Sequence, residues 1–221
     1  MSNTTLDPRL MKHVDLLISR YPVLEECRDS IINAYLIMEE TYSHDGKLLV
    51  AGNGGSAADS EHIAGELMKR FKTPRPVDQS FANKLVAADP KRGPQLAKNL
   101  EKSLMAIPLV AHEALSTAYI NDVDGYGVFA QQLFGFGRPG DVFLGISTSG
   151  NSQNVMNAVA VAKALGIKVI GLTGAKGGEL AQVADVAVKV PQTETYMIQE
   201  LHLPVYHTWC LMLEDHFFGK E

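Results

Sequence analysis

The sequence has few cysteines, no excess of basic residues and no long apolar run, and each shortage excludes a class of protein. Only two of the 221 residues are cysteines, too few for a disulfide framework or a zinc–thiolate cluster, so we expect a reduced, cytoplasmic setting. The formal net charge is −5, and the scattered Lys and Arg residues provide no basic stripe for a nucleic-acid backbone. No uncharged apolar run reaches the ~20 residues of a membrane span, and the polar N-terminus is unlike a signal peptide. We therefore expect no nucleic-acid partner and no membrane association.

Hydrophobic residues make up 46% of the chain, enough to bury one sizeable core, and we expect a single domain over residues 1–221. Short apolar runs alternate with helix-forming segments along most of the sequence. The expected strands are residues 47–51, 107–110, 141–146, 168–172 and 186–190. Strands that alternate with helices form a parallel sheet covered on both faces. The sequence therefore predicts an α/β fold with three α/β/α layers around a central, five-stranded, mainly parallel sheet.

Three further segments are predicted to be helical. Residues 1–45 carry apolar residues at helical spacing and should form two N-terminal helices with a break near Pro22. Residues 73–105 are rich in Pro, Lys, Asp and Gln and contain no strand-like run. They are expected to form an inserted helical hairpin with a turn near residues 89–93. Residues 196–218 should form a long C-terminal helix.

The segment 147–152, Ser-Thr-Ser-Gly-Asn-Ser, places four hydroxyl groups between an expected strand and the N-terminus of an expected helix. Free backbone amides and the helix dipole favour an anion there, and the hydroxyls add donors, so a phosphate monoester fits. A lone Ser-Gly-Asn more often only caps its helix, but four hydroxyls favour the anion site. The segment lacks the Gly-Lys-Ser/Thr ending of a nucleotide P-loop, which argues against ATP or GTP.

A second loop, residues 52–56, has the sequence Gly-Asn-Gly-Gly-Ser and follows the first expected strand. It lacks the full Gly-x-Gly-x-x-Gly pattern of dinucleotide-binding proteins. No acidic residue appears at the usual distance after a following strand. We therefore expect no nucleotide cofactor.

Two pairs of polar residues could serve acid–base or metal chemistry. His62 and Glu66 are four residues apart, so both should project from one face of a helix, near its glycine-loop end. Taken alone, such a pair is more often a surface interaction. Gln199 and His207 lie eight residues apart in a largely apolar stretch, where polar side chains need partners. His202, between them, is expected to be a hydrogen-bonded structural histidine rather than a ligand.

Together these residues resemble the SIS-domain phosphosugar isomerases, and among them the phosphoheptose (sedoheptulose 7-phosphate) isomerases. The landmarks occur in the family order over residues 47–218, and their combination is highly specific. They are Gly52-Asn53-Gly54-Gly55-Ser56, His62, Glu66, Ser147 to Ser152, Leu172-Thr173-Gly174, Gly177-Gly178, Ile198-Gln199-Glu200 and His207. The resemblance implies the flavodoxin-like SIS fold. It also implies a homotetramer with active sites at subunit interfaces and a sugar phosphate as substrate.

The resemblance also implies a role for each matching position. The catalytic pair would be Glu66, as the base, and His207, as its acid–base partner. Substrate and phosphate contacts would come from Asn53, Gly54, Ser56, Ser147, Thr148, Ser149, Ser152, Gln199, His112 and Asn121. In a number of family members the positions of His62, Glu66, Gln199 and His207 bind zinc. A divalent metal, Zn²⁺, is therefore the cofactor that the resemblance implies.

The chain departs from the family pattern where sugar hydroxyls would be bound. The insertion 73–105 replaces a short connection, His112 stands for an aspartate, and Met197 and Tyr196 stand for an arginine and an acidic residue. We expect an aldose–ketose isomerase that acts through an enediol, with sedoheptulose 7-phosphate as the first substrate. Another sugar phosphate or a sulfonated sugar is the alternative on the same scaffold. The third possibility is a non-catalytic module that senses sugar phosphates or binds a replication initiator. The presence of both Glu66 and His207 argues against it.

Overall fold

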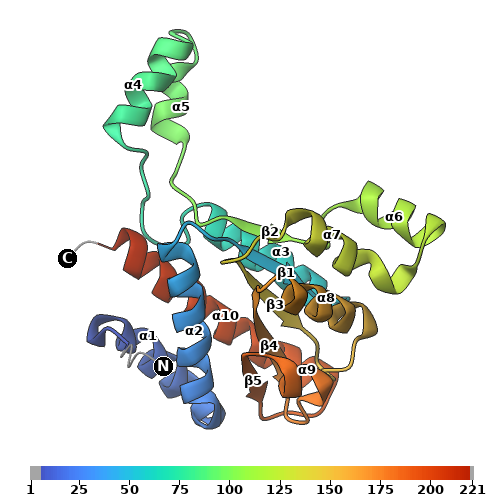
Figure 1. The fold of residues 1–221 in the computed structure, drawn as a ribbon. Helices are drawn as coiled ribbons and strands as arrows, with labels where there is room; N and C mark the ends of the chain where they lie inside the picture. The colour runs from blue at the N-terminus through green and yellow to red at the C-terminus, as the bar shows by residue number, and fades with distance from the viewer. Residues whose placement is uncertain (1–5, 220–221) are drawn as a thin grey trace.

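The computed structural model describes residues 6–219 of the chain. Its elements are α1 (Pro8–Arg20), η1 (Pro22–Cys27), α2 (Arg28–Ser43), β1 (Leu48–Ala51), α3 (Gly55–Met68), α4 (Gln79–Ala88), α5 (Gly93–Asn99), β2 (Ala106–Pro108), α6 (Glu113–Asp122), η2 (Gly125–Gly127), α7 (Val128–Phe136), β3 (Val142–Ile146), α8 (Gln153–Ala164), β4 (Lys168–Gly174), α9 (Gly178–Val183), β5 (Val186–Val190) and α10 (Thr195–Phe218). Figure 1 shows a layered body from which the α4–α5 hairpin projects.

The five strands form one sheet in the order β2-β1-β3-β4-β5, and every neighbouring pair is parallel. Strands β1 and β3 are buried along their whole length, as expected of parallel strands covered on both faces. This arrangement confirms the predicted three-layer α/β/α fold. The order changes direction between β1 and β3, and the loops after two such strands diverge to leave a crevice for ligands.

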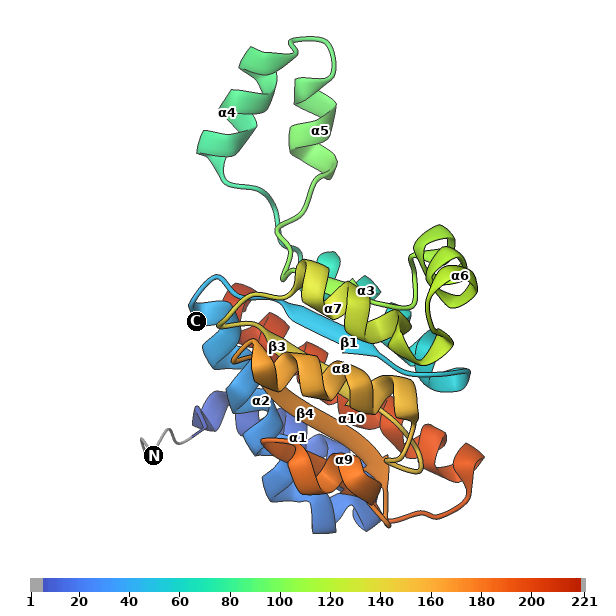
Figure 2. The ribbon, with the colours of Figure 1, turned by 45° about the vertical axis from the view of Figure 1, so that its right-hand side comes forward.

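Side chains of β1 alternate between two hydrophobic cores, one on each face of the sheet. Leu48 and Val50 pack with α1, α2, α3 and α10, while Leu49 and Ala51 pack with α7, α8 and α9. Successive side chains of a strand point to opposite faces, so one short apolar run serves both cores. Figure 2 shows α7, α8 and α9 covering one face and α2 and α10 behind the other.

The predicted N-terminal and C-terminal helices are present, and they pack against each other. Helix α1 buries Leu10, Val14 and Leu17, which lie on one helical face, against the core that includes α10. The Trp209 indole of α10 donates to the Ile31 carbonyl of α2 over 3.0 Å. Among the helices described between residues 6 and 219, none combines the length and the apolar character that crossing a bilayer requires.

Residues 73–105 form the predicted helical insertion, which stands away from the body on two extended stems (Figures 1 and 2). The stems pair through a bridge between Pro76 and Glu101. At the tip, the Asp89 carboxylate accepts from the amides of Lys91 and Arg92, each over 2.9 Å, and so fixes the turn. The predicted hairpin is therefore confirmed.

Candidate active site

The serine loop, residues 147–152, lies between β3 and α8 at the carboxyl edge of the sheet. Ser147 and Ser152 brace it, because their Oγ atoms are 2.9 Å apart and the Gly150 amide donates to the Ser147 Oγ. Gly150 has φ +68°, and a Cβ there would lie 1.9 Å from the Gly177 carbonyl oxygen. Only glycine fits this position, since the φ is unfavourable for other residues and no space exists for a side chain.

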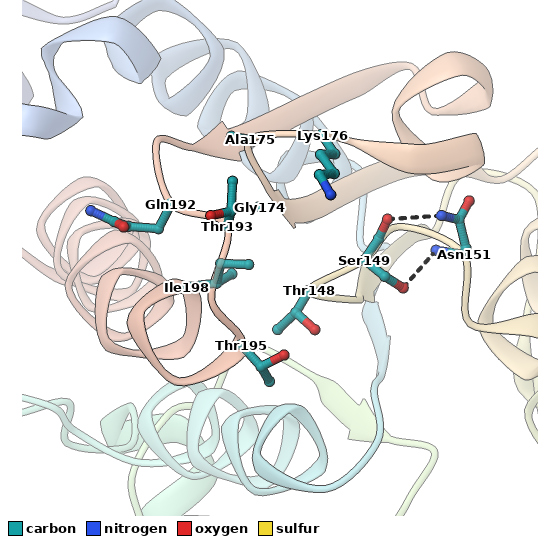
Figure 3. A pocket seen from close by; sticks show the side chains of 10 residues that line it. All are labelled: Thr148, Ser149, Asn151, Gly174, Ala175, Lys176, Gln192, Thr193, Thr195 and Ile198. Carbon is teal, nitrogen blue, oxygen red and sulfur yellow. Dashed lines mark hydrogen bonds between the residues drawn. The ribbon is translucent and has the colours of Figure 1, made fainter.

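A cavity of ≈ 270 Å³ adjoins this loop. Thr148 and Ser149 line it, whereas the buried Ser147 does not. The lining residues are Thr148, Ser149, Asn151, Gly174, Ala175, Lys176, Gln192, Thr193, Thr195 and Ile198. Figure 3 shows the Lys176 side chain on the same rim as Ser149. Hydroxyls, a helix N-terminus and a lysine ammonium at one cavity suit a phosphate monoester.

The glycine loop, residues 52–56, is held to the serine loop through α8, the helix that follows the serine loop. Asn53 and Asn154, which lies in the first turn of α8, exchange two amide hydrogen bonds of 2.9 Å. Gly54 has φ +56° at the N-cap of α3, and Ser56 is buried. Gln199 of α10 also reaches this loop, because a Cβ on Gly55 would lie 2.6 Å from its Nε2. Asn53, Gly54, Ser56 and Gln199 are thus gathered at the crevice between β1 and β3.

His62, Glu66 and His207 form a second group, here called the proton-transfer cluster. His62 Nε2 lies 3.3 Å from Glu66 Oε1, and the rings of His62 and His207 meet edge to face with centroids 4.9 Å apart. Burial lowers the pKa of His207, and the neighbouring His62 lowers it further. His207 Nε2 is buried and has no hydrogen-bond partner among the described residues. The cluster thus joins a carboxylate to a histidine whose neutral form is favoured.

Tyr206 and Asp59 orient His62, although the sequence predicts a role for neither residue. The Tyr206 hydroxyl donates to Asp59 Oδ1 over 3.1 Å, so its oxygen is free to accept from His62 Nδ1 at 3.0 Å. A proton on Nδ1 leaves the lone pair of a neutral His62 on Nε2, facing the Glu66 carboxylate. The signals were weak: Asp59 precedes His62 by one helical turn, and Tyr206 adjoins His207.

His62 Nε2 and Glu66 Oε1 lie 3.3 Å apart, and each presents a lone pair to the other. A shared proton or a cation between them would suit this arrangement. Even so, no three His, Cys, Asp or Glu side chains within residues 6–219 are arranged to hold a metal ion. Gln199 lies beside Gly55, eight residues and about 12 Å along α10 from His207. The donor types fit a divalent metal, and His62 lies near both Glu66 and His207, but the three side chains do not converge on one point in a single chain.

The serine loop and the proton-transfer cluster are separated in one chain. Glu66 lies in the last turn of α3, eleven residues after Gly55, or about 16 Å along the helix axis. The expectation that His62 and Glu66 lie near the glycine-loop end is therefore wrong for Glu66, because α3 has nearly four turns. His207 lines a different cavity, of ≈ 370 Å³, together with α1 residues such as His13 and Arg20.

The remaining predicted positions lie outside both groups. His112 is the N-cap residue of α6, and its Nδ1 lies 2.8 Å from Gln132 Oε1. Asn121 is exposed on α6 and donates to Asp122 Oδ1. His202 is fully buried, and neither of its ring nitrogens makes a hydrogen bond of ordinary geometry within the described residues, although the Thr173 backbone favours its protonated form. The expectation of a hydrogen-bonded structural histidine is therefore only half right.

Comparison with known proteins places these features in a family. The model of the SIS domain matches residues 14–104 and 94–174. A phosphoheptose isomerase of Aneurinibacillus thermoaerophilus is 39% identical over 182 residues, covering 82% of this chain and 79% of that protein. One of Nitratiruptor sp. is 38% identical over 195 residues, covering 88% and 90%. The solved phosphoheptose isomerase of Neisseria gonorrhoeae superposes with a TM-score of 0.71 at 32% identity, covering 96% of this chain and all of that one. The chain belongs to the SIS domain family.

Proposed function

We propose that this protein is an aldose–ketose isomerase that interconverts sedoheptulose 7-phosphate and a heptose 7-phosphate through an enediol. One observation carries the proposal: the chain keeps both a hydroxyl-rich anion loop at the β1–β3 crevice and a carboxylate–histidine cluster. A sensor of sugar phosphates needs only the loop, whereas proton transfer needs the cluster. Relatives named phosphoheptose isomerase, at 36–40% identity, support the choice of substrate.

The reaction follows from the two groups. Amides and hydroxyls of the serine loop, chiefly Thr148 and Ser149, hold the phosphate, and this anchoring fixes the opened sugar near the cluster. Glu66 removes the proton from the carbon next to the carbonyl group. The carbonyl oxygen takes a proton as the enediol forms, and His207 is placed in the cluster to supply it. Glu66 then returns the proton to the former carbonyl carbon, and the hydroxyl on the other carbon gives its proton to His207, which restores both residues and completes the isomerisation.

We further propose that the cluster holds a divalent metal, Zn²⁺. His62, Glu66 and His207 would hold it, and Gln199 is the fourth ligand that the resemblance suggests. The metal would supply a Lewis acid for the substrate oxygens. The unpartnered His207 Nε2 and the His62 Nε2 that faces Glu66 support this assignment.

The separation of the two groups supports a site shared between copies. The cavity at the serine loop and the cavity at His207 have no lining residue in common. A second copy that contributes its cluster to the serine loop of the first would complete the site. We therefore propose a homotetramer with active sites at subunit interfaces. The cytoplasmic location, the single domain over residues 1–221 and the absence of a nucleic-acid partner stay predictions.

The test is an NMR assay with sedoheptulose 7-phosphate, with and without zinc and a chelator. Glu66→Gln should lower kcat by about 10²-fold or more, because the base is lost. Glu61→Gln is the matched control, since Glu61 is an exposed residue of the same helix, and it should keep wild-type activity. A kcat for Glu66→Gln within a few-fold of the wild-type value would refute the assignment of Glu66 as the base.

A different sugar phosphate is the second candidate substrate. Tyr196 is 58% exposed and directly follows Thr195, which lines the serine-loop cavity. An aromatic side chain at this rim changes the contacts available to the hydroxyl groups of the sugar. Turnover of another ketose phosphate in a panel would keep the mechanism and reassign the substrate, whereas binding without any turnover would indicate a sensor.

A further inference from the structure

The α4–α5 hairpin, residues 79–99, has an apolar surface that no other segment between residues 6 and 219 covers. Helix α4 buries no residue, and α5 buries only Gly93. The apolar side chains on and beside the hairpin, Phe81, Val86, Leu96 and Leu100, are 39–46% exposed. Helices of ten and seven residues are marginal without packing partners. The hairpin therefore needs a further surface to pack against.

The hairpin is basic in an acidic protein. It contains Lys84, Lys91, Arg92 and Lys98 against a single acid, Asp89, whereas the chain has 20 basic and 25 acidic residues. Only Arg92 is paired within the hairpin, with Asp89. A basic, apolar surface favours a partner that is acidic and apolar.

The same chain has a surface of that kind. The α6–η2 surface, residues 113–126, contains Glu113, Asp122 and Asp124 and no lysine or arginine. Helix α6 buries no residue. The large apolar side chains of this surface, Leu115, Ile120, Val123 and Tyr126, are 42–67% exposed. Charge and apolar character thus complement those of the hairpin.

The hairpin and the α6–η2 surface do not meet within one chain. Figures 1 and 2 both show the hairpin and α6 projecting from separate regions of the body, away from each other. The stems fix this position, because the Pro76–Glu101 bridge and the buried Arg75 hold them to the body. A contact between the two surfaces therefore requires two copies of the chain.

An active site shared between two copies would bring the hairpin of one copy close to the α6–η2 surface of the other. This step depends on the proposed function. The hairpin is rooted at Glu66, since the Arg75 guanidinium donates to the Glu66 and Leu67 carbonyls over 3.2 and 2.8 Å. The α6–η2 surface is joined to α8, which begins at the serine loop, through a 2.9 Å bond from Asn157 to the Tyr126 carbonyl. When Glu66 of one copy approaches the serine loop of another, the hairpin of the first approaches α8 and α6 of the second.

We propose that the α4–α5 hairpin of one copy docks on the α6–η2 surface of a second copy. Lys84, Lys91 and Lys98 face the acids of that surface, and the apolar side chains of both elements cover each other. The insertion is then an arm that holds together the two copies that share a site.

Cross-linking tests the contact. A tagged Leu96→Cys protein is mixed with a Val123→Cys protein, subunits are exchanged, and a short thiol cross-linker is added. The native Cys27 and Cys210 are buried and stay in place. The matched control replaces the second protein by Val23→Cys, whose exposed residue belongs to η1. We expect a tagged–untagged dimer in several-fold higher yield than in the control, and equal yields would overturn the proposal.

Charge reversal tests the energetics. Lys84→Glu/Lys98→Glu should raise the subunit dissociation constant about tenfold at low salt, and adding Glu113→Lys/Asp122→Lys should reverse most of the effect. Lys163→Glu/Lys168→Glu, on α8 and β4, is the charge-matched control. An unchanged dissociation constant would contradict the docking. A wild-type monomer without isomerase activity would refute the proposed function, whereas an active oligomer that ignores the reversal would refute the docking alone.

Discussion

At the scale of single residues, the orientation of His62 is the feature from which most of the cluster chemistry follows. Asp59 and Tyr206 hold a proton on Nδ1, so that Nε2 faces Glu66. Partners of this kind commonly set the tautomer and direction of a histidine that binds a metal or moves a proton. We regard Tyr206 as a positioning residue, because it acts on the site through His62.

Tyr206→Phe should therefore lower kcat about tenfold and leave KM for the substrate nearly unchanged. The phenylalanine keeps the ring packing but removes the hydroxyl that accepts from Nδ1. Steady-state kinetics measure the effect, and the pH profile of kcat should also shift because the tautomer is no longer fixed. Tyr35→Phe, a buried tyrosine of α2, is the control. Equal losses in kcat and stability, without a change in the pH profile, would indicate a purely structural role for Tyr206.

The buried His202 makes stability depend on pH. Burial lowers its pKa from 6.5 to about 4, so the native protein binds this proton only below that pH, whereas the unfolded chain binds it below about 6.5. The histidine is neutral in both states above the unfolded pKa, and stability falls as the pH is lowered from there toward the folded pKa. The total loss attributable to this group is about 3 kcal/mol.

His202→Leu should remove this part of the pH dependence. The variant should gain stability relative to wild type as the pH falls from 7 to 4, because leucine cannot be protonated and leaves no buried nitrogen without a partner. Urea unfolding at several pH values measures the difference. Parallel stability curves for the two proteins over this range would show that the pKa of His202 is not lowered in the native state.

At the scale of elements, a buried ion pair fixes the end of α3 and the root of the hairpin. The side chains of Arg75 and Glu214 are 0% and 2% exposed and lie 2.8 Å apart. Glu214 also accepts from the amides of Phe71, Lys72 and Thr73. Burial favours its protonated form, but these donors and Arg75 outweigh burial and hold its pKa below the usual value. Its contribution to stability is present above the normal glutamate pKa and is lost as the pH falls through the lower, folded value.

Arg75→Met should lower the free energy of unfolding by about 3–5 kcal/mol, because it leaves a buried carboxylate without its cation. Denaturant unfolding at pH 7 measures the loss. Arg75→Met/Glu214→Gln removes both charges and should recover part of it. A double variant as unstable as the sum of the two single variants would show that the residues do not interact.

Several elements could be predicted from the sequence because their local patterns match their burial. Strand β3 is buried on both faces and needs a continuous apolar run, while the glycines and serines that follow can only form a loop. The edge strand β2 is shorter than expected, Ala106–Pro108 instead of residues 107–110, and its bonds to β1 end at the Leu109 amide, which donates to the Val50 carbonyl over 2.8 Å. The site was less predictable. The distance of Glu66 from the glycine loop depends on where α3 ends, and the Tyr206–His62 bond joins residues 144 positions apart.

At the scale of the whole molecule, the proposed sharing of sites predicts that two inactive variants complement each other. Glu66→Gln impairs the cluster and Ser149→Ala with Thr148→Ala impairs the serine loop. If each site takes its loop from one copy and its cluster from another, random exchange of subunits should restore about a quarter of the wild-type sites. The activity of the mixture, compared with that of each variant alone, measures this. No recovery after verified exchange would mean that both halves of each site come from one chain.

The bridge between Pro76 and Glu101 also makes the insertion a separable cassette. The chain leaves the body and returns to it at adjacent points, so closing the gap with a tight turn would shorten the polypeptide without stretching any remaining connection. The same junction offers a place for a foreign sequence, such as an epitope or a second binding module. An isomerase scaffold with such a junction can exchange its accessory arm while the sheet, the serine loop and the cluster stay as they are.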